Sequence, residues 1–169
     1  MSNVGTIALQ FEPTDVRALL TSSLAPLMEQ ARNARIELRV DALGDVPPFA
    51  IDREKIAWAV TALVGNAMRY VRRGGAQGEL GGSIVVHLEH DRANRELTIS
   101  VQDDGPGISK ERVHSLFQRR EGAAHSGALA LSLMRDVVSA HGGRLSVESR
   151  TEPHDHGTSI SMILPEARI

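Results

Sequence analysis

Residues 100–109 read SVQDDGPGIS, and this segment is the clearest indicator of the fold expected for the chain. A strand is expected over residues 96–103, and it carries Asp103 to its end. Gly105-Pro106-Gly107 then turns the backbone sharply, because glycine and proline are the strongest local breakers of regular structure. The segment therefore predicts a sheet strand that presents a carboxylate next to a glycine-rich turn.

Before this stretch, the sequence predicts a second strand over residues 83–90, joined to the first around Ala93-Asn94, and a glycine-rich loop over residues 72–82. A long helix is expected to begin at Asp52, a good N-cap residue, and to run through Val71. Its apolar residues recur at helical spacing and predict one buried face, formed by Ile56, Ala59, Val60, Leu63, Val64 and Ala67.

Nearer the N-terminus, helical spacing of apolar residues predicts one helix over residues 16–31, and alternation predicts a strand over residues 36–41. Pro47-Pro48 separates that strand from the long helix. Residues 1–10 are expected to form an N-terminal arm or an edge strand.

Beyond the Gly-Pro-Gly turn, we expect a short helix near residues 111–117 and a longer one over residues 127–141. Gly142-Gly143 suits the end of that helix, since glycine adopts the left-handed C-cap conformation without strain. The chain then predicts a hairpin with strands over residues 144–150 and 158–164.

Together these elements predict an α+β fold: a two-layer α/β sandwich whose mixed, mostly antiparallel sheet carries about three helices on one face. The chain has 169 residues, the usual size of a single domain, so one domain is expected over residues 1–169.

Composition excludes several classes of protein. Aromatic residues are only 3% of the chain, so the core is expected to be aliphatic. The net charge of −2 argues against a nucleic-acid-binding surface, and the absence of cysteine excludes disulfides and thiolate chemistry. The longest apolar stretch, residues 56–65, is too short to cross a bilayer, and residues 1–10 do not form a signal peptide. We therefore expect a cytoplasmic domain that does not itself insert into a membrane.

Three residues on one side of the long helix can carry chemistry. Asn66, Arg69 and Tyr70 are spaced so that they share that side. An amide oxygen beside a cation can hold a magnesium-bound polyphosphate, because magnesium takes a few protein oxygens together with phosphates. The alternative is a polar residue that merely caps the end of the helix.

The turn and the next long helix offer two further candidates. Asp103 can accept a hydrogen bond from an amino group such as that of adenine, and Gly105 and Gly107 let a flat base approach the main chain. The small residues from Ser126 to Ala130 can present free N–H groups to a phosphate. The alternatives are an ordinary tight turn and an ordinary helix start.

The order of these motifs resembles the catalytic ATP-binding (HATPase) domain of sensor histidine kinases, within the GHKL ATPase superfamily. The resemblance covers residues 11–165 and is sharpest in NAMRY (66–70), DDGPGI (103–108) and DVVSAHGGRLSVES (136–149). It implies that Asn66 ligates magnesium and that Arg69, in place of the usual lysine, contacts phosphate.

The same resemblance assigns roles at the turn. It implies that Asp103 binds the adenine amino group, that Gly105 and Gly107 are the glycines of the D-x-G-x-G box, and that Tyr70 flanks the nucleotide.

Two boxes depart from the family pattern. Phe117 is what remains of the F box, and the G-x-G-L-G-L of the G2 box corresponds here to Ser126, Gly127, Ala128 and Leu129, followed by Ala130-Leu131. Hydrolytic members of the superfamily carry a glutamate one turn before the metal-binding asparagine, where this chain has Ala62. These departures predict weak or altered nucleotide binding and disfavour ATP hydrolysis as the main activity.

The resemblance thus implies a domain that binds Mg-ATP and donates its γ-phosphate to a histidine on a separate dimerisation domain, with a response regulator as further partner. Two alternatives stay open. One is a degenerate, non-catalytic module for nucleotide sensing or docking, and the other is a serine kinase of the anti-sigma type.

Overall fold

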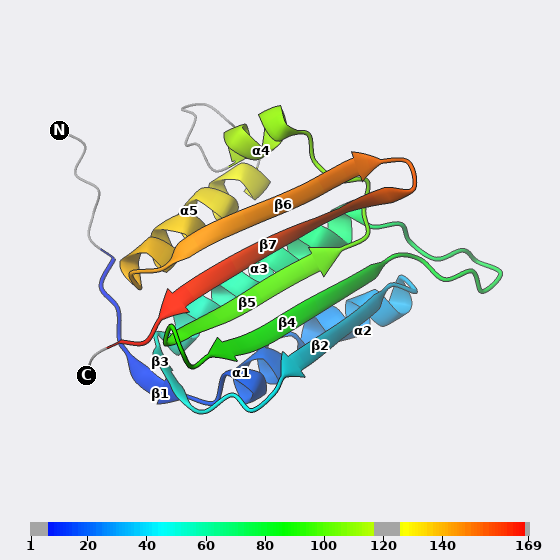
Figure 1. Ribbon diagram of the computed structural model, residues 1–169. Helices are drawn as coiled ribbons and strands as arrows, with labels where there is room; N and C mark the ends of the chain where they lie inside the picture. Colours follow the sequence, from blue (N-terminus) through cyan, green and yellow to red (C-terminus); the bar gives the residue numbers. More distant parts are fainter. Residues whose placement is uncertain (1–6, 117–125, 168–169) are drawn as a thin grey trace.

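The computed structural model describes residues 7–116 and 126–167, and its centre is a five-stranded sheet with helices packed on one face (Figure 1). The strand order is β2 (Glu37–Leu43), β4 (Ser83–Asp91), β5 (Glu96–Asp103), β7 (Asp155–Pro165) and β6 (Arg144–Glu152). Strands β2 and β4 are parallel, and the other neighbouring strands are antiparallel. The predicted fold class is therefore confirmed.

The helical layer is formed mainly by α1 (Val16–Ser23), α2 (Ala25–Asn33), α3 (Arg53–Tyr70) and α5 (Ser126–Ala140). Helix α3 lies in the middle of this layer, behind β5, while α5 packs on β6 and β7 and α2 on β2 (Figure 1). The short helix α4 (Lys110–Leu116) contacts α5. The end of α3 and the end of β5 are therefore placed side by side.

The single helix predicted over residues 16–31 is wrong, because the chain forms two helices that meet at Leu24. Pro26 stands in the first turn of α2, has no N–H, and its ring would clash with the Ser22 carbonyl in a continuous helix. Both helices still bury apolar residues, since Leu20 in α1 and Ala31 in α2 are buried.

Two short strands were missed by the sequence analysis. Strands β1 (Glu12–Thr14) and β3 (Phe49–Ile51) pair antiparallel in a separate two-stranded sheet. Each is too short to show a period in the sequence. Residues 7–10 form no strand, and residues 1–6, the rest of the expected arm, lie outside the described residues.

The C-terminal hairpin is longer than predicted. Pairing continues to Glu152 and Asp155, so that Pro153 and His154 form its tip. Helix α5 ends before Gly142, whose φ of +78° is the left-handed C-cap conformation expected there.

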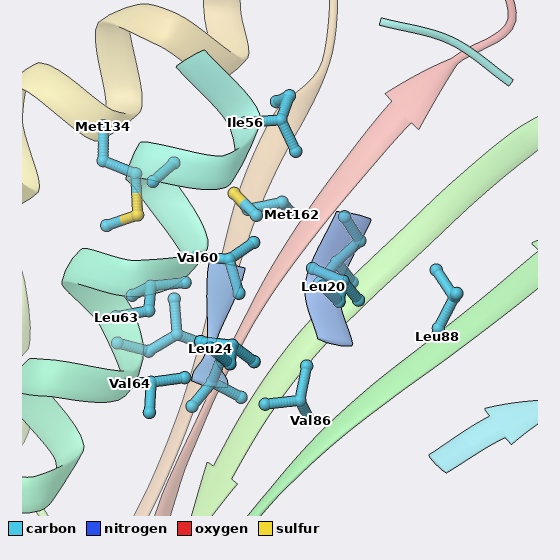
Figure 2. Packing of buried hydrophobic residues seen from close by; sticks show 14 of the residues in the cluster. Leu20, Leu24, Ile56, Val60, Leu63, Val64, Val86, Leu88, Met134 and Met162 are labelled. Atoms are coloured by element: carbon cyan, nitrogen blue, oxygen red, sulfur yellow. The ribbon is translucent and has the colours of Figure 1, made fainter. Parts of the chain in front are cut away.

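The core lies between α3 and the sheet. Asp52 caps α3 by accepting a hydrogen bond from the backbone N–H of Lys55 at 3.1 Å. The buried face of α3 consists of the six residues predicted for it, and Figure 2 shows Val60, Leu63 and Val64 among neighbours such as Val86 and Met162. Each fully buried aliphatic side chain stabilises the fold by about 1.5–3 kcal/mol relative to an exposed one.

Within the described part of the chain, we find no helix with the length and apolar character needed to span a bilayer.

Candidate functional site

The last two turns of α3 carry Asn66, Arg69 and Tyr70, as predicted. Asn66 is half-buried, whereas Arg69 and Tyr70 are exposed. Asn66 lines two cavities, a narrow one shared with Tyr70 and a wide one shared with Arg69. It therefore lies at the boundary between the two cavities.

The narrow cavity lies between α3 and the ends of β5 and β7 and has a volume of about 20 Å³. Its lining combines aliphatic side chains with a few polar groups: Leu63, Asn66, Ala67, Tyr70, Val101, Asp103, Gly107, Ile108, Thr158 and Ile160. Apolar walls around a small number of fixed polar groups are typical of small-molecule sites.

Asp103 is the only carboxylate among the residues that line this narrow cavity. Its Oδ1 accepts a hydrogen bond from the backbone N–H of Gly105 at 2.9 Å. Burial raises the pKa of Asp103 above its ordinary value, and the nearby Asp104 adds to the rise, while backbone hydrogen bonds from Gly105 and Thr158 oppose it. A carboxylate can accept about four hydrogen bonds, so Asp103 retains capacity for a donor from a ligand.

The turn after Asp103 requires glycine at residue 107. Gly107 has a φ of +81°, and a Cβ there would collide with the carbonyl oxygen of Arg150. A Cβ on Gly105 would lie 2.9 Å from Asp103 Oδ1. The predicted glycines therefore allow the turn to lie against both the hairpin and the carboxylate.

Two residues that sequence reasoning did not assign to the site hold this turn in place. Ser149 Oγ accepts a hydrogen bond from the backbone N–H of Ile108 at 2.7 Å. His156 Nδ1 donates to the carbonyl oxygen of Gly105 at 2.6 Å. Both belong to the β6–β7 hairpin. The hairpin is far from the turn along the sequence, so local sequence patterns could not predict these two hydrogen bonds.

The wide cavity lies over α3 and has a volume of about 640 Å³. It is lined by residues of α2, α3 and α5 and of the loop after α3: Leu27, Gln30, Asn33, Ala34, Ile36, Ala62, Gly65, Asn66, Met68, Arg69, Arg73 and Leu131. Ala62 and Gly65 present little or no side chain to this space. Arg73 was not predicted as a site residue.

The remaining predicted site residues belong to the segment before and at the start of α5. Phe117 lies outside the described residues. Ser126–Leu129 form the first turn of α5, so their backbone is helical. Leu131, in the next turn, lines the wide cavity, so the start of α5 lies close to that cavity.

The combined site suits a ligand with two unlike ends. The narrow cavity offers apolar walls and a carboxylate acceptor to a group that donates hydrogen bonds, and the wide cavity offers guanidinium groups to an anionic group. Asn66 contributes an amide to both.

Known proteins with this architecture include sensor kinases. KinB of Pseudomonas aeruginosa, an alginate biosynthesis sensor protein, is 27% identical over 167 residues, which cover 95% of this chain and 26% of KinB. This chain therefore spans about a quarter of that relative.

Solved structures share the fold. Full-length ShkA in complex with AMPPNP superimposes with a TM-score of 0.78 at 20% identity, covering 98% of this chain and 33% of ShkA. Histidine kinase ThkA in complex with the response regulator protein TrrA gives a TM-score of 0.73 at 21% identity, covering 94% of this chain and 42% of ThkA.

The family match covers the site as well as the fold. Residues 51–168, which include α3, the Gly-Pro-Gly turn and α5, match the histidine kinase-, DNA gyrase B- and HSP90-like ATPases. Since this match extends over more than half of the sequence, the chain belongs to that ATPase family.

Proposed function

We propose that this chain binds Mg-ATP and donates the γ-phosphate to a histidine on a separate dimerisation domain, as part of two-component signalling. The observation that carries the proposal is the position of Asn66 between the cavity of Asp103 and the cavity of Arg69. That arrangement supports a nucleotide whose base lies beside Asp103 and whose phosphates extend past Asn66.

The donor set is compatible with magnesium. Among residues 7–116 and 126–167, no three His, Asp or Glu side chains form a metal-binding group, while Asn66 offers an amide oxygen. Magnesium commonly uses one or two protein oxygens and completes its shell with phosphates and water. When bound, the ion would neutralise phosphate charge during transfer.

The residues of this chain then act by binding and orientation. Asp103 would hold the base through its amino group, and Arg69 would attract the phosphates, so that the γ-phosphate is presented in a fixed direction. Ala62 lines the wide cavity without a carboxylate, so it offers no base for water. This favours transfer to a protein acceptor over hydrolysis.

The proposed partners follow from the same branch of the family. The HGGRL segment at residues 141–145 and Ala62 favour the histidine kinases over the gyrase-like and HSP90-like members. ShkA was crystallised with AMPPNP and ThkA with a response regulator. By this likeness, we propose a response regulator as the final phosphoryl acceptor, and the cytoplasm as the location.

The test is phosphorylation of a supplied histidine-containing dimerisation domain in the presence of Mg-ATP. Transfer should be lost in both Asn66→Ala and Asp103→Ala and retained in Asp45→Ala, a control with an exposed carboxylate far along the chain from the site. The product should be acid-labile, because it is a phosphohistidine. Transfer that survives both site variants would refute the proposal, and an acid-stable product would favour a serine kinase.

A second candidate is a degenerate module that docks or regulates without catalysis. The departures from the G2 pattern favour it, because Ser126, Ala128 and Ala130 stand where that pattern has glycine. Calorimetric titration with ATP and ADP, with and without magnesium, separates the two candidates. No binding at millimolar nucleotide would favour the docking module.

A further inference from the structure

Two guanidinium groups line the wide cavity. Arg69 is in the last turn of α3, and Arg73 follows the end of that helix. Both are exposed, and within residues 7–116 and 126–167 neither has an ion-pair partner. Two unpaired cations at one cavity favour an anion that carries several charges.

The backbone around Arg73 is held from both sides. The carbonyl oxygen of Arg72 accepts a hydrogen bond from Gly82 N at 2.7 Å, and Gly74 N donates to the carbonyl oxygen of Ala34 at 2.9 Å. Arg73 is thus fixed between the end of α2 and the returning end of the glycine-rich loop.

The close approach of the loop depends on Gly81. A Cβ at this position would collide with the carbonyl oxygen of Arg72 and would lie 2.7 Å from Gly74 N. Glycine therefore lets the returning chain pack directly on residues 72–74. The backbone of residues 72–74 thus has a defined place, and Arg73 is the residue of this segment that lines the wide cavity.

Neighbouring Arg72 differs from Arg73 in its contacts. Its Nη2 donates a hydrogen bond to the carbonyl oxygen of Leu80 at 3.1 Å, and it is not part of the cavity lining. The two residues have the same charge and similar exposure but different surroundings. Arg72 is therefore a matched control for any effect of Arg73.

We propose that Arg73 is a phosphate-binding residue that acts beside Arg69 on the distal phosphates of the nucleotide. This inference rests on the proposed function, because it takes the wide cavity as the place of the phosphates. Asn66 lines both cavities, and Arg69 and Arg73 line the wide one. A ligand with its base beside Asp103 and its phosphates past Asn66 would therefore direct its terminal phosphates towards Arg69 and Arg73. The contact is made only by nucleotides that carry distal phosphates.

Calorimetric titration of ATP, ADP and adenosine into the native chain, Arg73→Gln and Arg72→Gln tests the proposal. We expect Arg73→Gln to weaken ATP binding by about tenfold, the loss typical of a charge-assisted hydrogen bond. ADP should lose less, and adenosine should be unaffected. Arg72→Gln should change ATP affinity by less than about twofold, and raising the salt concentration should reduce the difference between the two variants.

Two further measurements keep the outcomes distinct. Thermal unfolding checks that both variants fold, and Arg73→Lys, which keeps the charge, should recover part of the ATP affinity. Equal weakening in Arg73→Gln and Arg72→Gln, or equal loss for ATP and adenosine, would overturn the assignment of Arg73 alone. A native chain that binds adenosine but shows no preference for ATP would also overturn it, whereas failure of the native chain to bind any nucleotide would overturn the proposed function and this inference together.

Discussion

At the scale of single residues, Asp103 is placed where ligand binding and stability have opposite requirements. Burial raises the pKa of Asp103, so the folded state disfavours its ionised form. The ionised form is the stronger acceptor for a hydrogen bond from the amino group of a nucleotide base. Because the pKa of this carboxyl is raised in the folded state, the folded state loses stability as the pH rises through that pKa. At neutral pH the charge therefore destabilises the fold.

We predict that Asp103→Asn raises the melting temperature at pH 7–8 by roughly 1–4 °C, because asparagine carries no charge while its Oδ1 can still accept from Gly105 N. The same variant should weaken ATP binding by about 10- to 100-fold, since the charged acceptor is lost. Thermal denaturation and calorimetry measure the two effects. The control is Asp104→Asn, because exposed Asp104 keeps an acceptor for Ser83 N and should bind ATP within about twofold of the native chain.

An unchanged ATP affinity in Asp103→Asn would show that this carboxylate does not contact the base. A fall in the melting temperature of Asp103→Asn would show that the hydrogen bonds accepted by the Asp103 carboxylate stabilise the fold by more than its burial destabilises it.

At the scale of elements, the β6–β7 hairpin positions the turn of residues 105–108. Ser149 Oγ accepts from Ile108 N at 2.7 Å and lies 2.9 Å from Thr158 Oγ1. We predict that Ser149→Ala weakens ATP binding by about three- to tenfold, because one lost hydrogen bond of about 0.5–1.5 kcal/mol loosens the turn. Ser146→Ala, an exposed serine on the same strand, should leave ATP affinity unchanged in the same titration.

If Ser146→Ala and Ser149→Ala behave alike, the hairpin does not position the turn. A loss of melting temperature in Ser149→Ala without a loss of ATP affinity would assign Ser149 to stability alone.

The elements that could be predicted from sequence are those with a long period or a strong boundary signal. Helix α3 has a full apolar face and an Asp52 cap, and its buried residues were all identified. The break at Leu24 was missed because the apolar spacing continues through it, although Pro26 was the available signal. The three-residue strands β1 and β3 carry too few residues for any pattern.

The candidate site divides in the same way. Asn66, Arg69, Tyr70 and Asp103 lie within two short motifs. Local spacing made them candidates, and the order of the motifs, through the family resemblance, assigned their roles; the fold brings three of them to one cavity. The contacts of Ser149 and His156 depend on how the hairpin pairs with β5, which local patterns do not specify. Arg73 could not be predicted as a site residue, because a loop has no periodic pattern that indicates which way a side chain points.

At the scale of the whole molecule, His141 joins segments that are far apart in the sequence. Its Nδ1 donates to the carbonyl oxygen of Val137 at 2.8 Å, and its Nε2 accepts from the backbone N–H of Asp52 at 3.1 Å. The ring also packs edge-to-face on Phe11, at a centroid distance of 5.3 Å. The end of α5, the start of α3 and the N-terminal segment thus meet at one buried imidazole.

This imidazole must be neutral, because a protonated Nε2 could not accept from Asp52 N. Burial lowers the pKa of His141, while its bond to Val137 and the charge of Asp52 partly oppose this and Lys55 adds to it. A histidine whose folded pKa is lowered binds more protons when unfolded, so its contribution to stability is complete above the unfolded pKa near 6.5 and declines as the pH falls below it. Asp52 stays ionised over this range: burial alone would raise its pKa, but hydrogen bonds from Gln10 and Lys55 lower it overall.

We therefore predict that His141 makes the melting temperature of the native chain fall relative to that of His141→Gln as the pH is lowered from 7.5 to 5, by about 2–4 °C for each kcal/mol lost. The raised pKa of Asp103 acts in the opposite direction but is common to both proteins. In His141→Gln the melting temperature at pH 7.5 should be lower than in the native chain, because the packing on Phe11 is lost, but most of the decline towards pH 5 should disappear. His154→Gln, at the exposed tip of the hairpin, should keep the native pH dependence. A decline that persists unchanged in His141→Gln would place the titrating group elsewhere, and thermal denaturation of the three proteins across this pH range decides between the two outcomes.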